Sequence, residues 1–389
     1  MANKQTAIRI NCDSGRSRSE DGNPRGGTGV FRTELRDCCG VWLACGKRPR
    51  RFADIGEYVL MASPRVSRRV VFTVPFLAAS GAARHAAAGD GDFSAFLSGV
   101  RRDAAAQGIR GSTIEVALRR AEYLSHVIEL DRKQPERTLT FGEYLDKVVT
   151  SQRMDGARRE LAENRVLLDG IWRRFNVEPR FVVALWGIES DFGKIMGNFA
   201  VVSALATLAY DGRRSSYFRG ELISALRILD QGHIRADNMT GSWAGAMGQC
   251  QFMPSTFLGY AVDYDGDGRK DIWNDRADAL ASIANFISHL GWRGGEGWGR
   301  EVMLPAGFDA RYTGLEVKRP TGEWSRLGVR SVDAGPLAGR EGEASLVMPD
   351  GAGGPAFLVY DNFRTIMKWN KSTYFAAAVG YLADSMARG

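Results

Sequence analysis

The sequence predicts a mainly α-helical protein with a small β-containing subdomain near its C-terminus, a fold of the α+β type. Two observations lead to this class. From about residue 92 to residue 298, apolar residues recur at three- and four-residue spacing, which is the period of an amphipathic helix. Residues 300–362 are instead rich in glycine and proline and contain short apolar pieces such as "EASLVMP" and "AFLVY".

The helical segments follow one another with few interruptions. Residues 131–148 are polar and contain a proline, so we expect a linker there. Pro179 and Pro254 stand near the start of their segments, where a missing backbone N–H leaves no intrahelical bond unmade. The pattern predicts helices over residues 94–108, 113–130, 151–175, 177–188, 201–212, 219–231, 253–263, 276–292 and 372–386.

The first 88 residues differ in composition from the rest. The formal net charge of +7 is concentrated in them, and the remainder is nearly balanced, so we expect no nucleic-acid binding. Residues 1–60 lack apolar periodicity, and we interpret them as an upstream extension or a disordered tail. Residues 61–88 contain an Arg pair, an apolar stretch and small residues, an order typical of a bacterial export signal. We therefore expect a catalytic domain over 89–389 that works in the periplasm.

Glu189 lies in the stretch "ALWGIESDFG", about ten residues after Pro179, and so near the C-terminal end of its predicted helix. The negative end of the helix dipole disfavours a second negative charge there. Burial beside Trp186 and Phe192 would raise the carboxyl pKa further. A carboxylic acid that stays protonated near neutral pH can serve as the general acid of glycosidic cleavage. A surface glutamate with a basic neighbour is the alternative.

A two-carboxylate glycosidase would need a second acid across the scissile bond. Asp191 is two residues further on, where a continued helix would point it away from Glu189, and Asp211 and Asp237 have no special context. Chemistry that rests on one carboxyl group therefore remains open. The segment "GSWAGAMGQCQFMPSTF" offers tight turns at its glycines, and Ser242 and Gln251 offer neutral hydrogen bonds for sugar hydroxyl and acetamido groups.

The loop "DYDGDGRKDIWN" resembles a calcium-binding loop of the EF-hand type. At its twelfth position Asn274 replaces the usual bidentate glutamate, so Asp275 or Asp278 would have to supply the last carboxylate. Carboxylates this close repel one another unless a cation lies among them. We expect a structural Ca²⁺ and no organic cofactor, with ligands from Asp263, Asp265, Asp267, Arg269 (through its carbonyl) and Asp271, and a last ligand from Asp275 or Asp278.

The motif "WGIESDFG", followed further along the chain by "GSWAGAMGQCQFMPS", resembles the lytic murein transglycosylase B family. The resemblance runs from about Phe93 to the C-terminus and includes the acidic loop, where it favours Asp278 as the last ligand. Several separated motifs in the same order make it specific. It implies a lysozyme-like helical core, with the small β-containing subdomain at about 300–362, that acts on peptidoglycan glycan strands.

The resemblance also implies roles for individual residues. It places the catalytic acid/base on Glu189. A further aromatic position, often tyrosine in the family, is Phe286 here and lacks the hydroxyl. The substrate-binding residues it implies are Ser242, Gln251, Arg213, Arg214, Asn370, Tyr374 and Phe286.

The implied reaction cleaves the β-1,4 bond between N-acetylmuramic acid and N-acetylglucosamine and leaves a 1,6-anhydromuramoyl end, so the substrate supplies its own nucleophile. Two alternatives remain: a muramidase that uses water, and a non-catalytic, calcium-stabilised glycan-binding module. We expect a monomer, which could act beside other cell-wall remodelling proteins.

Overall fold

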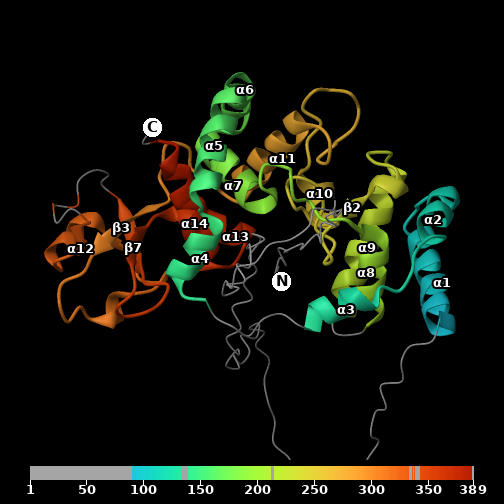
Figure 1. Ribbon diagram of the computed structural model, residues 1–389, viewed down its shortest axis with the longest axis horizontal. Helices are drawn as coiled ribbons and strands as arrows, with labels where there is room; N and C mark the ends of the chain where they lie inside the picture. The colour runs from blue at the N-terminus through green and yellow to red at the C-terminus, as the bar shows by residue number, and fades with distance from the viewer. Residues whose placement is uncertain are drawn as a thin grey trace, which may run out of the picture.

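The computed structural model describes residues 90–132, 139–211, 214–332, 335, 337 and 342–387. The predicted extension, the export signal and Arg213 lie outside the described residues. The described part is mostly helical with one five-stranded sheet, which confirms the predicted fold class (Figure 1). None of its helices has both the length and the apolar content needed to cross a bilayer.

One end of the molecule is built from five helices (Figure 1). The predicted helix 113–130 is two helices, because the residues between them bond to a neighbouring helix instead. The backbone N–H of Leu124 donates to Thr207 Oγ1 at 3.0 Å, and that of Glu122 donates to Ser203 Oγ at 3.3 Å. The five helices are α1 (Asp90–Ala106), α2 (Gly111–Leu118), α3 (Ser125–Arg132), α8 (Val201–Tyr210) and α9 (Ser215–Asp230).

The predicted linker at 131–148 contains a helix, α4 (Phe141–Val148). Thr140 and Glu143 form a capping box at its start, and its apolar face carries Phe141 and Tyr144. The predicted helix 151–175 is divided at Asn164, whose side-chain nitrogen donates to the Glu160 carbonyl at 2.8 Å. The two halves are α5 (Ser151–Glu163) and α6 (Arg165–Phe175).

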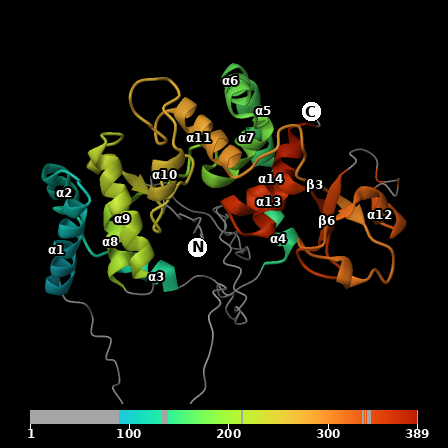
Figure 2. The ribbon, with the colours of Figure 1, turned by 180° about the vertical axis from the view of Figure 1, so that it is seen from behind.

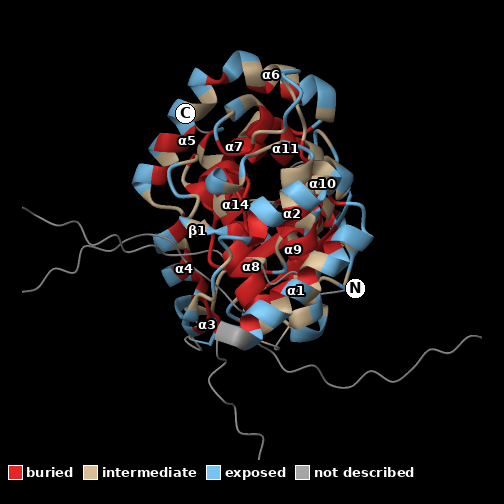
Figure 3. Ribbon diagram, turned by 90° about the vertical axis from the view of Figure 1, so that its right-hand side faces the viewer, coloured by how far each residue is buried: buried red, intermediate tan, exposed pale blue. Residues whose placement is uncertain are grey.

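The central helix, α7 (Pro179–Ser190), begins at the predicted proline and is buried from Phe181 to Ser190. It packs against α14 (Thr373–Ser385), α5 and α11 (Arg276–His289). Figure 3 shows buried residues along α7 and α14. The remaining elements of this body are β1 (Phe199–Ala200), β2 (Thr240–Gly241), a 3₁₀ turn (Ala236–Asn238), α10 (Pro254–Tyr260) and α13 (Asp361–Trp369).

The sheet lies at the opposite end of the molecule from α1 and α2 (Figure 2). Its strands are antiparallel in the order β4-β6-β7-β3-β5, with Leu346 opposite Leu358. A second, small core that includes Trp324 forms on it. The elements are β3 (Gly299–Met303), a 3₁₀ turn (Ala310–Tyr312), β4 (Arg319–Pro320), α12 (Thr321–Arg326), β5 (Arg330–Ser331), β6 (Glu343–Val347) and β7 (Ala356–Val359).

Gly197 brings the loop after α7 against the glycine-rich segment, which is residues 241–257. Its φ is +86°, and a Cβ atom there would lie 2.2 Å from the Gly241 carbonyl oxygen. We expect Gly197→Ala to lower the free energy of unfolding by about 2–4 kcal/mol, since backbone strain and overlap add. Urea unfolding measures this change. Gly220→Ala is the matched control. A Cβ at Gly220, in α9, meets no atom within 4 Å, so this substitution is expected to raise the free energy of unfolding by about 0.5–1 kcal/mol. Equal stability of the two variants would contradict the prediction.

Candidate active site

Glu189 is the penultimate residue of α7, as the sequence predicts, and its side chain is 4% exposed. The chain leaves the helix at once, because Asp191 and Phe192 adopt left-handed conformations with φ of 48° and 60°. Ser190 secures this turn: its hydroxyl donates to the Gln249 carbonyl at 2.8 Å and accepts from the Gly193 N–H at 3.0 Å. The carboxyl group is therefore held at a buried helix end.

Burial raises the pKa of Glu189 from 4.5 to about 8. One hydrogen bond opposes this shift: the indole N–H of Trp369 donates to Glu189 Oε1 at 2.7 Å. The other oxygen, Oε2, is buried and has no hydrogen-bond partner among the described residues. At neutral pH the group is therefore a carboxylic acid with one oxygen fixed and the other unengaged.

The glycine-rich segment packs behind this carboxyl group. Gly245 and Gly248 have φ of +86° and +61°, and a Cβ at Gly248 would lie 2.6 Å from the Ile272 carbonyl. Ser242 and Gln251 are both buried. The Ser242 hydroxyl accepts from the Ala246 N–H at 3.0 Å, and the Gln251 amide nitrogen donates to the Met196 and Gly248 carbonyls at 3.0 and 2.9 Å. The backbone of their own loop thus orients both side chains, and the loop after α7 also orients Gln251.

The other predicted substrate-binding residues fall in different surroundings. Asn370 is half-buried and directly follows Trp369, the residue that donates to the Glu189 carboxyl group. The Tyr374 hydroxyl donates to Asp350, and its ring packs on Phe141 and Tyr144.

Two of the predicted residues are engaged with other side chains. Phe286 is buried, with its ring centroid 4.9 Å from that of Trp369. Arg214 bonds to the buried Asp131 at 2.7 Å.

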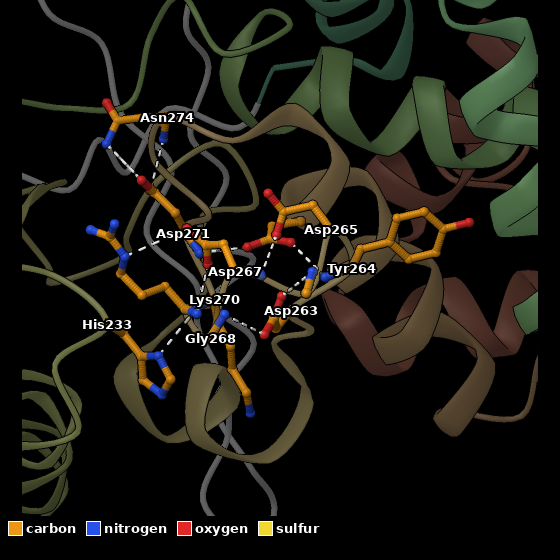
Figure 4. Close-up of polar contacts among 12 residues, drawn as sticks. His233, Asp263, Tyr264, Asp265, Asp267, Gly268, Lys270, Asp271 and Asn274 are labelled. Atoms are coloured by element: carbon orange, nitrogen blue, oxygen red, sulfur yellow. Dashed lines mark hydrogen bonds and ion pairs between the residues drawn. The ribbon is translucent and has the colours of Figure 1, made fainter.

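The acidic loop brings three of its predicted ligands together, two of which, Asp263 and Asp265, are labelled in Figure 4. Carboxylate oxygens of Asp263, Asp265 and Asp278 lie within 4.8 Å of one another. Asp267 and Asp271 lie outside this group. Asp271 Oδ1 instead accepts from the N–H groups of Trp273 and Asn274 at 3.0 and 2.8 Å. Arg269 contacts Asp267 twice: its backbone N–H donates to Asp267 Oδ1 at 2.7 Å, and its guanidinium Nε lies 3.5 Å from Asp267 Oδ2.

Gln249 joins the acidic loop to α7. Its backbone N–H donates to the Ile272 carbonyl at 2.8 Å, and its side-chain nitrogen donates to the Trp273 carbonyl at 3.1 Å. Its side-chain oxygen accepts from the Trp186 indole at 3.0 Å. A single buried glutamine thus connects the turn beside the acidic loop with α7 one turn before Glu189.

A model of the transglycosylase SLT domain matches residues 92–384. The chain belongs to this family. Membrane-bound lytic murein transglycosylase B of Escherichia coli (strain K12) is 35% identical over 227 residues, which are 57% of this chain and 60% of that protein. The chain therefore covers less than two thirds of the length of this relative.

Two solved structures of lytic transglycosylases resemble this SLT domain. SltB3 from Pseudomonas aeruginosa in complex with NAG-anhNAM-pentapeptide has a TM-score of 0.74 and 45% identity, covering 76% of this chain and 80% of that one. Escherichia coli Slt35 in complex with calcium has a TM-score of 0.64 and 29% identity, covering 76% of this chain and 92% of that one. The family resemblance and the fold predicted from the motifs are confirmed.

Each candidate second carboxylate in this SLT domain faces a cation. Asp191 Oδ1 lies 3.5 Å from Arg153 Nε and its Oδ2 lies 3.8 Å from Lys194 Nζ. Asp211 lies 3.1 Å from Arg132, and Asp237 contacts Arg120. None of the three is placed as a free base for water.

Sequence reasoning missed two side chains beside Glu189. Trp369 was not singled out, although Phe363, Ile366 and Trp369 recur at three-residue spacing on a helix that the sequence analysis did not predict. Tyr144 lay in the segment taken as a linker. Its hydroxyl is buried, and burial and the Glu189 charge raise its pKa, while Arg153 lowers it. The capping box and the apolar spacing of 141–148 were the signals that could have found Tyr144.

Proposed function

We propose that this protein is an exported peptidoglycan lytic transglycosylase in which Glu189 is the sole acid/base. The observation that carries the proposal is the buried Glu189 carboxyl group, with a pKa of about 8 and one oxygen that has no hydrogen-bond partner within the described part of the chain. Membership of the family and the NAG-anhNAM-pentapeptide bound to SltB3 support peptidoglycan as the substrate class. The action on glycan strands and the periplasmic location follow from this proposal.

In the proposed reaction, Glu189 first donates its proton to the oxygen of the β-1,4 bond between N-acetylmuramic acid and N-acetylglucosamine. The bond between that oxygen and muramoyl C1 breaks, and the acetamido group of the same sugar stabilises the positive charge. Glu189, now a carboxylate, takes the proton of the muramoyl C6 hydroxyl, whose oxygen bonds to C1. The 1,6-anhydro ring closes without water, and Glu189 is protonated again.

The cation pairing of Asp191, Asp211 and Asp237 supports this single-carboxyl route over hydrolysis. An inverting hydrolase would need a free carboxylate to activate water, and a retaining one would need a carboxylate nucleophile. An internal hydroxyl needs neither. The proton acceptor for the second step is the Glu189 carboxylate that the first step produces.

We assign substrate contacts to Ser242, Gln251 and Asn370. The Gln251 amide nitrogen is engaged by backbone carbonyls, which leaves its oxygen to accept from a sugar hydroxyl or acetamido N–H. The Ser242 hydroxyl accepts from Ala246 and retains its own proton for donation to an acetamido oxygen. Outer contacts are assigned to Arg213, Arg214 and Tyr374, and Phe286 acts through the ring of Trp369.

We also propose a structural Ca²⁺ in the acidic loop. The residues fit such an ion: three carboxylates converge, and the donors are oxygens, which hard cations prefer. Burial raises the pKa of Asp278, and the charges of Asp275 and Asp265 add to this, which is the repulsion that a cation would relieve. Asp263, Asp265 and Asp278 would hold the ion, and it would stiffen the turn that Gln249 connects to α7.

Removal of calcium is expected to lower the thermal unfolding midpoint by about 3–6 °C, because the ion binds only the folded loop. Scanning calorimetry with calcium and with a chelator measures this difference. Asp265→Asn should abolish most of it, since Asp265 is exposed and its substitution disturbs the metal-free fold little. Asp146→Asn, an exposed carboxylate on α4, should keep the full difference. Identical midpoints with calcium and chelator would refute the site.

The reaction is tested by mass spectrometry of the muropeptides that the purified protein releases from peptidoglycan sacculi. We expect fragments ending in 1,6-anhydromuramic acid, each one water lighter than the corresponding reducing end. Reducing ends would show a muramidase and overturn the transglycosylase assignment. Glycan binding without release would show a binding module.

A further inference from the structure

The contact between Trp369 and Glu189 constrains the catalytic carboxyl group in a way that burial alone does not. The indole N–H donates to Oε1 at 2.7 Å, and Oε2 has no partner among the described residues. An indole nitrogen is a donor only and can never accept a proton. The carbonyl oxygen of a carboxylic acid is a stronger acceptor than its hydroxyl oxygen, so the indole contact favours Oε1 as the carbonyl oxygen and places the acidic proton on Oε2.

Packing fixes the position of this donor. The Trp369 ring contacts Phe286 of α11, with centroids 4.9 Å apart, and Phe252 of the glycine-rich segment, with centroids 5.6 Å apart. The rings of Phe252 and Phe286 also contact each other, with centroids 5.3 Å apart. Phe252 is itself held by two backbone hydrogen bonds with Met247, at 2.8 and 3.1 Å. Segments far apart in the chain therefore clamp the ring that aims the N–H at Glu189.

The helix that carries Trp369 is anchored at its other end. The side chain of the fully buried Asn362 accepts from the Arg293 N–H at 2.8 Å and donates to the Arg293 and Glu296 carbonyls at 2.9 and 2.7 Å. Thr365 donates to the Gly291 carbonyl at 3.2 Å. Helix α13 thus has little freedom to rotate, and the indole donor is preorganised before substrate arrives.

We propose that Trp369 is a positioning residue that gives the two oxygens of Glu189 different tasks: Oε1 is held as an acceptor, and Oε2 carries the proton that is transferred and later recovered. This inference rests on the proposed function. It explains why Oε2 is left without a protein partner, since that atom must reach the glycosidic oxygen and then the C6 hydroxyl. It also assigns Phe286 to the support of the indole ring.

Other titratable groups near Glu189 do not interfere with a pH measurement of this contact. Tyr144 from α4 and Cys250 from the glycine-rich segment both interact electrostatically with Glu189. Burial raises the pKa of each well above its ordinary value, so both stay neutral where Glu189 titrates. Arg153, from α5, is the basic side chain that lies near Tyr144 and Asp191. The alkaline limb of the rate profile therefore reports on Glu189.

The test compares Trp369→Phe with the wild-type protein on a soluble tetrasaccharide of alternating N-acetylglucosamine and N-acetylmuramic acid. We expect kcat to fall by about 10- to 100-fold with little change in KM, because a misaligned acid affects the transition state more than binding. Loss of the N–H donor should also move the alkaline limb of kcat to higher pH by about one unit. A second variant, with 3-benzothienylalanine at position 369, keeps the ring shape and lacks the N–H.

Trp292→Phe is the matched control, because the Trp292 indole also donates to a carboxylate, that of the half-buried Glu178, at 2.8 Å. It should keep kcat and the pH profile. A benzothienylalanine variant with wild-type kcat and an unmoved alkaline limb would overturn the positioning role, as would equal losses in Trp369→Phe and Trp292→Phe. Either result would leave the proposed function intact. The proposed function fails on a separate result, which is that Glu189→Gln remains active.

Discussion

Glu189→Gln is expected to lower the rate of glycan cleavage by about 10³-fold or more, because one carboxyl group supplies both proton transfers. The amide has nearly the same shape and is neutral, as the carboxylic acid is at neutral pH, so the buried site should keep its packing. Release of 1,6-anhydromuropeptides, followed by mass spectrometry over time, measures the loss. Binding of a soluble glycan fragment should persist.

Asp191→Asn is the matched control for this variant. Asp191 is the nearest carboxylate along the chain, and asparagine tolerates its left-handed conformation with φ of 48°. We expect cleavage to remain within about tenfold of the wild-type rate, since Asp191 is paired with Arg153 and Lys194 and takes no part in proton transfer. If Asp191→Asn were as inactive as Glu189→Gln, the reaction would need two carboxylates, and a muramidase would become the better description.

Glu189→Gln is also expected to be more stable than the wild-type protein, by an amount that depends on pH. The folded pKa of about 8 lies above the ordinary glutamate value of 4.5, so folding favours the protonated carboxyl group. The stability this group contributes is fully present below pH 4.5 and is lost as pH rises to about 8. Glutamine does not titrate, so the stability gained by substitution should grow across this window by on the order of 3–5 kcal/mol and then level off.

Urea unfolding of both proteins at pH 4.5, 6 and 8.5, in the presence of saturating calcium, measures this difference. Other titrating groups are common to both proteins, so their contributions cancel. A difference that does not change with pH would mean that Glu189 titrates normally in the folded protein. The same pKa predicts that the cleavage rate falls as pH rises through about 8, where the general acid loses its proton.

Local signals in the sequence were enough for several features of the fold. Pro179 and Pro254 each occupy the first position of a helix, because a residue without an N–H is tolerated only there. The periodicity of 151–175 located helical structure but not its division at Asn164, since that break depends on a side-chain bond to the Glu160 carbonyl. The helix at 141–148 was missed because its polar composition outweighed a capping box and a narrow apolar face.

The candidate site was likewise predictable from the sequence only in part. The position of Glu189 at a helix end and its burial were predictable from the ten residues around it. The engagement of Ser242 and Gln251 with their own backbone was not, because it depends on how the glycine-rich segment folds on itself. In the acidic loop, spacing named five ligands and the family resemblance added Asp278, whereas the fold directs Asp271 to the turn at 273–274 and leaves three carboxylates together.

The sequence by itself predicted which carboxyl group is the proposed acid and identified the family to which the chain belongs, because both depend on short motifs within the chain. Only the tertiary structure decided which oxygen of that carboxyl group is free. That choice depends on Trp369, which is far from Glu189 in the sequence and reaches it at 2.7 Å through the packing of α13 against α11 and the glycine-rich segment. A contact between distant segments leaves no periodic signal in a single sequence.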